Sequence, residues 1–136
     1  MITGGIIGGA FFTIYPLTSL SFYPAAHLIS VQSFLFHGLM LYGGLFLLIN
    51  CKIPLRIKDL GYYAAAVSSV SVIALIINLC LGTNLMFLSQ NYPGTFIEPM
   101  YNALPLPLFT LLSAAVQATM PFLLVFGVYK AVKWRK

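Results

Sequence analysis

The sequence predicts an all-α membrane protein, a polytopic bundle of four transmembrane helices forming a single domain over residues 1–136. Of these 136 residues, 60% are hydrophobic and 7% are charged, and the mean hydropathy is +0.97. A soluble domain carries about 25% charged residues, so this composition excludes the soluble classes. Chain length limits the number of spans, because each needs about 20 apolar residues.

Four apolar segments account for most of the chain. The predicted spans cover residues 3–19, 28–50, 62–82 and 106–130. The first is short and rich in glycine and ends at Pro16, whereas the last contains Pro121. The segment 83–105 is too polar and too rich in proline to span a membrane, and is predicted to be an outer loop or a re-entrant piece.

The positive residues predict the orientation of the chain. Its seven lysines and arginines lie between the second and third spans or after the last, as Lys52, Arg56, Lys58, Lys130, Lys133, Arg135 and Lys136. With four spans both clusters lie on one side, which the positive-inside rule makes cytoplasmic. Both termini are therefore expected in the cytoplasm, and the net charge of +5 indicates topology rather than binding of nucleic acid.

The first span carries pairs of glycines four residues apart. Such spacing lets two helix backbones approach closely in a membrane. We expect membrane lipid as one partner and self-association of the chain as a further contact, formed through Gly4, Gly5, Gly8 and Gly9.

Each of the later spans presents one polar stripe, because its polar residues recur at helical spacing. The stripes are Ser30, Ser33 and His37; Ser68, Ser71 and Asn78; and Thr110, Ser113 and Gln117. Lipid disfavours such faces, so they should turn toward the bundle interior. One interpretation is a polar pocket below the 83–105 segment, lined by Asn78, Asn84, Gln117, Ser33, Ser71 and Ser113. The other is hydrogen bonding between helices, worth about 0.6 kcal/mol per contact.

His37 is the candidate catalytic residue, because an ionisable group within a span is expected to be functional. Histidine serves as acid, base or ligand near neutral pH. No second histidine lies three or four residues from His37 and no carboxylate lies inside a span, so neither a metal nor a cofactor is expected. Cys80 is two residues from Asn78 and points away from any face that includes Asn78.

Four segments resemble the YwaF-like integral membrane proteins of bacteria, which are similar to a eukaryotic transmembrane acyltransferase family. They are Gly9–Pro16, Phe36–Gly38, Asn78–Leu88 and Pro93–Pro105, and the third is the most specific. Leu85 stands where the family signature has tyrosine. The resemblance implies a bacterial plasma membrane protein in which His37 aligns with a histidine proposed to act in acyl transfer. It also implies a partner cysteine upstream of the matched helices.

The expected function is that of a YwaF-like membrane protein of uncharacterised activity, either a truncated member or an assembly module. Two alternatives stay open. One is a lipid acyl-transfer enzyme with His37 as general base and Asn78 and Asn84 as orienting or oxyanion donors. The other is a small transporter or channel component whose polar stripes line a path. These alternatives leave open whether the chain is an enzyme.

Overall fold

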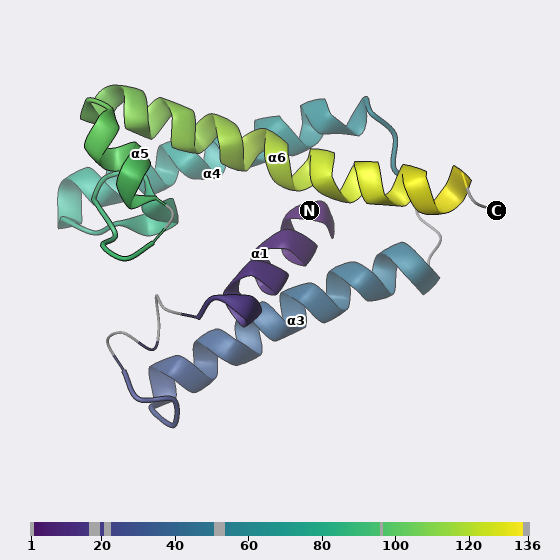
Figure 1. Cartoon of the computed structure of the whole chain (residues 1–136), viewed down its shortest axis with the longest axis horizontal. Helices are drawn as coiled ribbons and strands as arrows, with labels where there is room; N and C mark the ends of the chain where they lie inside the picture. Colours follow the sequence, from purple (N-terminus) through teal and green to yellow (C-terminus); the bar gives the residue numbers. More distant parts are fainter. Residues whose placement is uncertain (1, 17–19, 21–22, 51–53, 96, 135–136) are drawn as a thin grey trace. The chain divides into compact units, whose positions relative to one another are not determined.

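Every regular element in the described part of the chain is helical. The computed structural model describes residues 2–16, 20, 23–50, 54–95 and 97–134. In order the elements are α1 (Ile2–Ile14), α3 (Leu28–Asn50), α4 (Asp59–Leu81), the 3-10 helix η1 (Leu85–Phe87), α5 (Glu98–Ala103) and α6 (Leu106–Trp134) (Figure 1). The predicted all-α class is confirmed.

Three helices are long and apolar enough to cross a membrane: α3, α4 and α6. They correspond to the second, third and fourth predicted spans, and they support a multi-pass membrane protein. The first predicted span, 3–19, differs. Its helix α1 has 13 residues, or about 20 Å at 1.5 Å per residue, against a hydrocarbon core of about 30 Å.

The end of α1 has a local cause. Pro16 disfavours helical backbone in the residue before it, and α1 ends at Ile14. Residues 17–19 of the predicted span lie outside the described residues. The four-span count and the cytoplasmic location of both termini therefore stay predictions.

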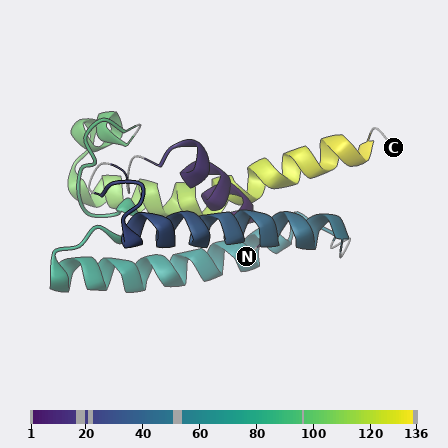
Figure 2. The ribbon, with the colours of Figure 1, turned by 90° about the horizontal axis from the view of Figure 1, so that it is seen from below.

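The chain forms two compact units. The first unit joins Met1–Ile57 to Pro121–Lys136, and the second unit is Lys58–Met120. In the first unit, α1 lies against the middle of α3 (Figure 2). The second unit contains a small core that includes Leu88 and Phe109, which are 1% and 0% exposed.

Glycines make the contact between α1 and α3 close. A Cβ atom added to Gly9 would lie 2.5 Å from the carbonyl oxygen of His37, and one on Gly44 would lie 3.0 Å from that of Ile2. A Cβ on Gly5 would lie 3.1 Å from the Met40 carbonyl oxygen. The close approach that the glycine spacing predicts is thus used within the chain, and self-association through these glycines stays a prediction.

The 83–105 segment is folded rather than extended. Helix α4 ends at Gly82, which has a left-handed φ of 64° and donates its N–H to the Asn78 carbonyl oxygen. The chain then forms η1 and, later, α5. The Tyr101 ring of α5 packs edge-on against Phe109 of α6, with ring centroids 5.0 Å apart.

Pro121 interrupts the backbone hydrogen bonding of α6, and a side chain of α4 supplies the missing donor. A proline has no backbone N–H, so it leaves the carbonyl four residues earlier, that of Gln117, without its helical partner. The Tyr63 hydroxyl on α4 donates to this carbonyl oxygen at 3.3 Å. Such compensation is what allows proline inside a membrane helix, where water cannot supply the missing donor.

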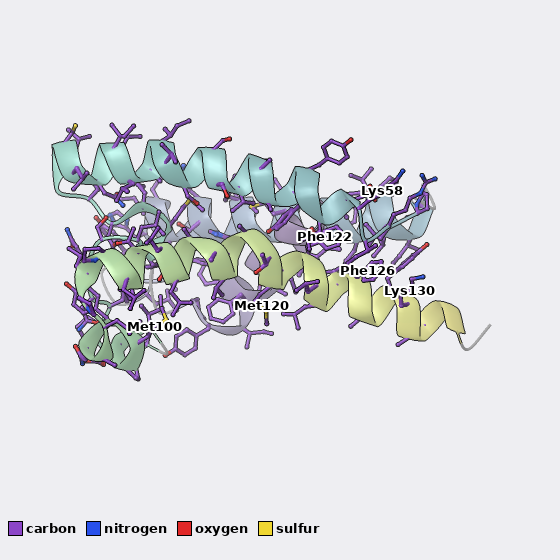
Figure 3. All side chains as sticks on the ribbon, turned by 90° about the horizontal axis from the view of Figure 1, so that it is seen from above. Lys58, Met100, Met120, Phe122, Phe126 and Lys130 are labelled. Carbon is purple, nitrogen blue, oxygen red and sulfur yellow. The ribbon has the colours of Figure 1, made fainter. Side chains whose placement is uncertain are left out.

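Beyond Pro121, one face of α6 carries two aromatic rings followed by a cation. Phe122 and Phe126 stack with centroids 5.9 Å apart. The Lys130 ammonium lies 5.7 Å from the Phe126 centroid (Figure 3). A cation in this position gains from the ring face and from the negative end of the helix dipole.

We predict that Gly9→Ala lowers the free energy of unfolding by about 2 kcal/mol, because the new methyl group meets backbone atoms that cannot move independently. The measurement is equilibrium unfolding in detergent micelles. Gly43→Ala is the control, since a Cβ there has nothing within 4 Å. Equal effects of the two variants would contradict the close α1–α3 contact.

A double-mutant cycle tests the role of Tyr63. Tyr63→Phe should cost about 1 kcal/mol of stability, because the Gln117 carbonyl loses its donor. In a Pro121→Ala background the restored helical N–H supplies that donor, so the same substitution should cost much less. Additive free energies of unfolding would show that Tyr63 does not compensate for Pro121.

Candidate functional site

Asn78 connects the end of α4 to the turn that follows it. Its Oδ1 accepts hydrogen bonds from the Leu85 N–H at 2.7 Å and the Thr83 hydroxyl at 2.9 Å. Its Nδ2 donates to the Leu85 carbonyl oxygen at 3.0 Å. The side chain is 3% exposed. A single buried amide therefore satisfies both backbone groups of Leu85.

The turn held by Asn78 is strained. Met86 and Phe87 have φ of 56° and 54°, a left-handed conformation that costs a residue with a side chain roughly 1–2 kcal/mol. Such a conformation persists only where surrounding contacts fix it. Side chains of α4 and α6 supply the contacts that fix this turn.

Side chains of α6 hold the turn from the other side. Gln117 Nε2 donates to the Met86 carbonyl oxygen at 2.8 Å, and the Thr110 hydroxyl donates to that of Leu88 at 2.7 Å. On α4, the Ser71 hydroxyl donates to the Val67 carbonyl oxygen at 2.9 Å and lies 3.8 Å from Met86 Sδ. The structure thus joins Asn78, Gln117 and Ser71 around one turn.

Asn84 likewise binds backbone groups that follow it in the chain. Its Oδ1 accepts from the N–H groups of Ser89 and Gln90 at 3.0 and 3.1 Å, and its Nδ2 donates to the Gln90 carbonyl oxygen at 3.1 Å. Gln90 in turn donates from Nε2 to the Gly82 carbonyl oxygen at 2.9 Å. These bonds close the segment 82–90 upon itself.

Ser113 is the exception on the α6 stripe. It lies between Thr110 and Gln117 in sequence and is 6% exposed, yet among the described residues its Oγ has no hydrogen-bond partner. Other helical hydroxyls, such as those of Thr13 and Thr119, donate to the carbonyl four residues earlier. Ser113 was predicted from its spacing alone, and a polar lining role for it stays a prediction.

The ring of Tyr92 contacts the strained turn. It packs edge-on against Phe87, with centroids 5.4 Å apart. Burial raises the pKa of the Tyr92 phenol above its ordinary value of 10.0. The phenol therefore stays protonated at neutral pH and acts as a neutral polar group beside the strained turn.

His37 belongs to the first unit, on α3. Its Nδ1 lies 2.8 Å from the Ser33 carbonyl oxygen. Because a carbonyl oxygen can only accept, Nδ1 carries the proton of the neutral ring, and Nε2 keeps its lone pair. Ser33, predicted as a pocket residue, thus contributes its backbone carbonyl. The ring stacks on Phe12 with centroids 3.9 Å apart.

His27 provides a contrast. Its Nδ1 accepts a hydrogen bond from the Ile29 N–H at 3.3 Å, at the start of α3. The neutral ring of His27 therefore carries its proton on Nε2, the reverse of His37. In His27 the basic nitrogen Nδ1 is occupied by the helix N–H. In His37 the hydrogen bond uses the protonated Nδ1, so the basic nitrogen is Nε2.

In the second unit, Asn78, Asn84 and Gln117 all bind backbone groups of the segment 83–90, and His37 belongs to the other unit. A single pocket shared by His37, Asn78 and Gln117 stays a prediction. The sequence interpretation omitted Tyr63, Thr83 and Gln90 as hydrogen-bonding residues. For Tyr63 a signal existed, since Pro121 inside a span requires a donor for the Gln117 carbonyl. Cys80 is exposed, as expected for a residue that faces away from buried Asn78.

A comparison with protein-family profiles gives a match over most of the chain. The profile of the TMEM164 family, a family of transmembrane proteins, matches residues 1–128. The matched range includes His37, Asn78 and Gln117. No curated protein and no solved structure matches the chain. The narrower resemblance to YwaF-like bacterial proteins stays a prediction.

We predict that Asn78→Ala lowers the free energy of unfolding by about 3 kcal/mol, since three hydrogen bonds of about 1 kcal/mol each are lost. Asn50→Ala is the control, because Asn50 donates one exposed bond, to the Phe46 carbonyl oxygen. That variant should change stability by less than about 0.5 kcal/mol. Detergent-based unfolding measures both, and similar values would contradict the role given to Asn78.

Proposed function

The chain belongs to the TMEM164 family, and from this premise we propose that it takes part in acyl transfer between membrane lipids, with His37 as general base. The observation that carries the proposal is the bond from His37 Nδ1 to the Ser33 carbonyl oxygen. That bond fixes the tautomer in which Nε2 can accept a proton. A general base needs this free lone pair and a defined direction.

In the proposed reaction His37 Nε2 takes the proton of a lipid hydroxyl as the hydroxyl oxygen attacks the carbonyl carbon of an acyl ester. The tetrahedral intermediate collapses when the bond to the donor alcohol breaks. His37 then returns the proton to the departing alcohol oxygen, so no other reactant is consumed. An apolar, half-buried position on a membrane helix suits substrates that are themselves lipids.

Asn78 and Asn84 are less suited to this chemistry than the sequence interpretation allowed. Each already binds backbone groups of the segment 83–90 through both its oxygen and its nitrogen. A role as oxyanion donor would need the remaining amide hydrogen. We therefore propose His37 alone as the catalytic residue of this chain.

A second function, as an assembly module, is favoured by the network around the turn. In the second unit the polar side chains of α4 and α6 bind the backbone of the same chain, which needs no substrate. Under this proposal the strained segment 83–90 is a rigid surface that orients neighbouring membrane proteins. We further propose that both termini are cytoplasmic, which the two clusters of positive residues support. The narrower YwaF-like assignment and a bacterial plasma membrane are proposed on the resemblance of the segment Asn78–Leu88 alone.

The test is transfer of a labelled acyl chain in vesicles that contain the full chain, a diacyl phospholipid and a lysophospholipid, followed by mass spectrometry. His37→Asn retains a side-chain N–H near the position of Nδ1 and removes the base. Its rate should fall about 100-fold.

The matched control is His27→Asn, which should leave the transfer rate unchanged. Wild-type rates in the His37→Asn variant would contradict the role of His37. Wild-type protein without any transfer, together with a stable fold, would favour the assembly module.

A further inference from the structure

Two phenylalanine rings contact the imidazole of His37, in different ways. Phe12 of α1 lies parallel to it, with an interplanar angle of 9° and centroids 3.9 Å apart. Phe36 of α3 meets it edge-on, at 88° and 5.3 Å. Phe12 is 8% exposed, whereas Phe36 is 60% exposed. Of these two rings, Phe12 is therefore the one that surrounding residues hold in place.

The position of Phe12 is set by the backbones of both helices. Gly9, one turn earlier on α1, lies so close to α3 that an added Cβ would be 2.5 Å from the His37 carbonyl oxygen and 2.7 Å from the Leu41 nitrogen. The Phe12 ring also packs on Phe34, at 5.3 Å and 70°. Helix α1 is thus held against the same residue whose ring Phe12 covers.

These contacts restrict the histidine side chain in complementary ways. The hydrogen bond to the Ser33 carbonyl fixes one atom of the ring, but it still permits the ring to tilt about that atom. The parallel Phe12 ring fixes the plane. Together they define the direction of the Nε2 lone pair, and proton transfer depends on that geometry before anything else.

We propose that Phe12 is the positioning residue of His37, and that α1 serves to hold it there. This inference rests on the proposed acyl transfer, because it assigns Phe12 a part in that reaction. Phe12 has a second effect when Nε2 takes a proton. The positive charge of the imidazolium then lies over the face of an aromatic ring, which is a favourable place for a cation.

The test combines ¹⁵N NMR of histidine-labelled protein in bilayers with the vesicle transfer assay. In the wild type the two ring nitrogens of His37 should give well separated signals, one protonated and one not. The His37→Asn spectrum identifies them, since the chain has two histidines. Phe12→Met keeps the volume and the apolar character of the side chain but removes the flat ring.

In Phe12→Met the two His37 signals should move toward each other, because a ring that is free to tilt breaks its bond to the Ser33 carbonyl part of the time and then exchanges between tautomers. The kcat should fall about tenfold with little change in KM, as expected for a misplaced catalytic group. Phe12→Tyr restores the ring and should restore both the spectrum and kcat. Phe36→Met, the matched control, removes the edge-on ring and should alter neither.

Wild-type signals and wild-type kcat in Phe12→Met would overturn the proposal. Equal changes in Phe12→Met and Phe36→Met would overturn it too, because any apolar contact would then suffice. Wild-type protein that transfers no acyl chain would overturn the proposed function. In that case a selective change of the His37 signals in Phe12→Met still supports the positioning of the ring by Phe12.

Discussion

The hydrogen bonds of Asn78 are the interaction on which the second unit depends. The chain leaves α4 at Gly82 and turns back through backbone that is not α-helical, next to apolar helices. Carbonyl and N–H groups of such a turn have no water to bind if they face hydrocarbon, and each would cost several kcal/mol if left without a partner. Asn78 satisfies both groups of Leu85. The α6 side chains Gln117 and Thr110 donate to the carbonyl oxygens of Met86 and Leu88.

The two units use their polar residues differently, and this difference leads to the functional conclusion. Around the turn the amides of Asn78, Asn84 and Gln117 are committed to backbone partners. In the α1–α3 pair, the His37 ring has Nδ1 bound to the Ser33 carbonyl, and its Nε2 has no hydrogen-bond partner among the described residues. Polar groups whose bonding is complete hold structure, whereas a basic nitrogen held in a fixed direction is suited to proton transfer.

The sequence predicted the helical class and the three long helices well, because apolar runs of about 20 residues have few other interpretations. In the first predicted span, helix α1 ends at Ile14, just before Pro16, and the four-span count stays a prediction. Helical spacing placed Asn78 and Gln117 on polar stripes, and it predicted that Cys80 faces away from the stripe of Asn78. Periodicity did not predict the hydrogen-bond partners of these side chains. The partners are backbone groups of a turn that is left-handed at Met86 and Phe87, and the sequence pattern does not reveal such a turn. The sequence also did not predict that Phe12 stacks on His37, because this contact depends on the close approach of α1 and α3 at Gly9.

The most direct test of this account is hydrogen–deuterium exchange at the Leu85 amide of the wild-type chain in lipid bilayers. This N–H lies in a segment outside the long helices, and its partner is the side-chain oxygen of Asn78 at 2.7 Å. We predict that this amide exchanges far more slowly than the amides of an unstructured peptide, at a rate comparable to that of amides within α4. Exchange at the rate of an open loop would contradict this prediction, because the turn could not then be held by Asn78.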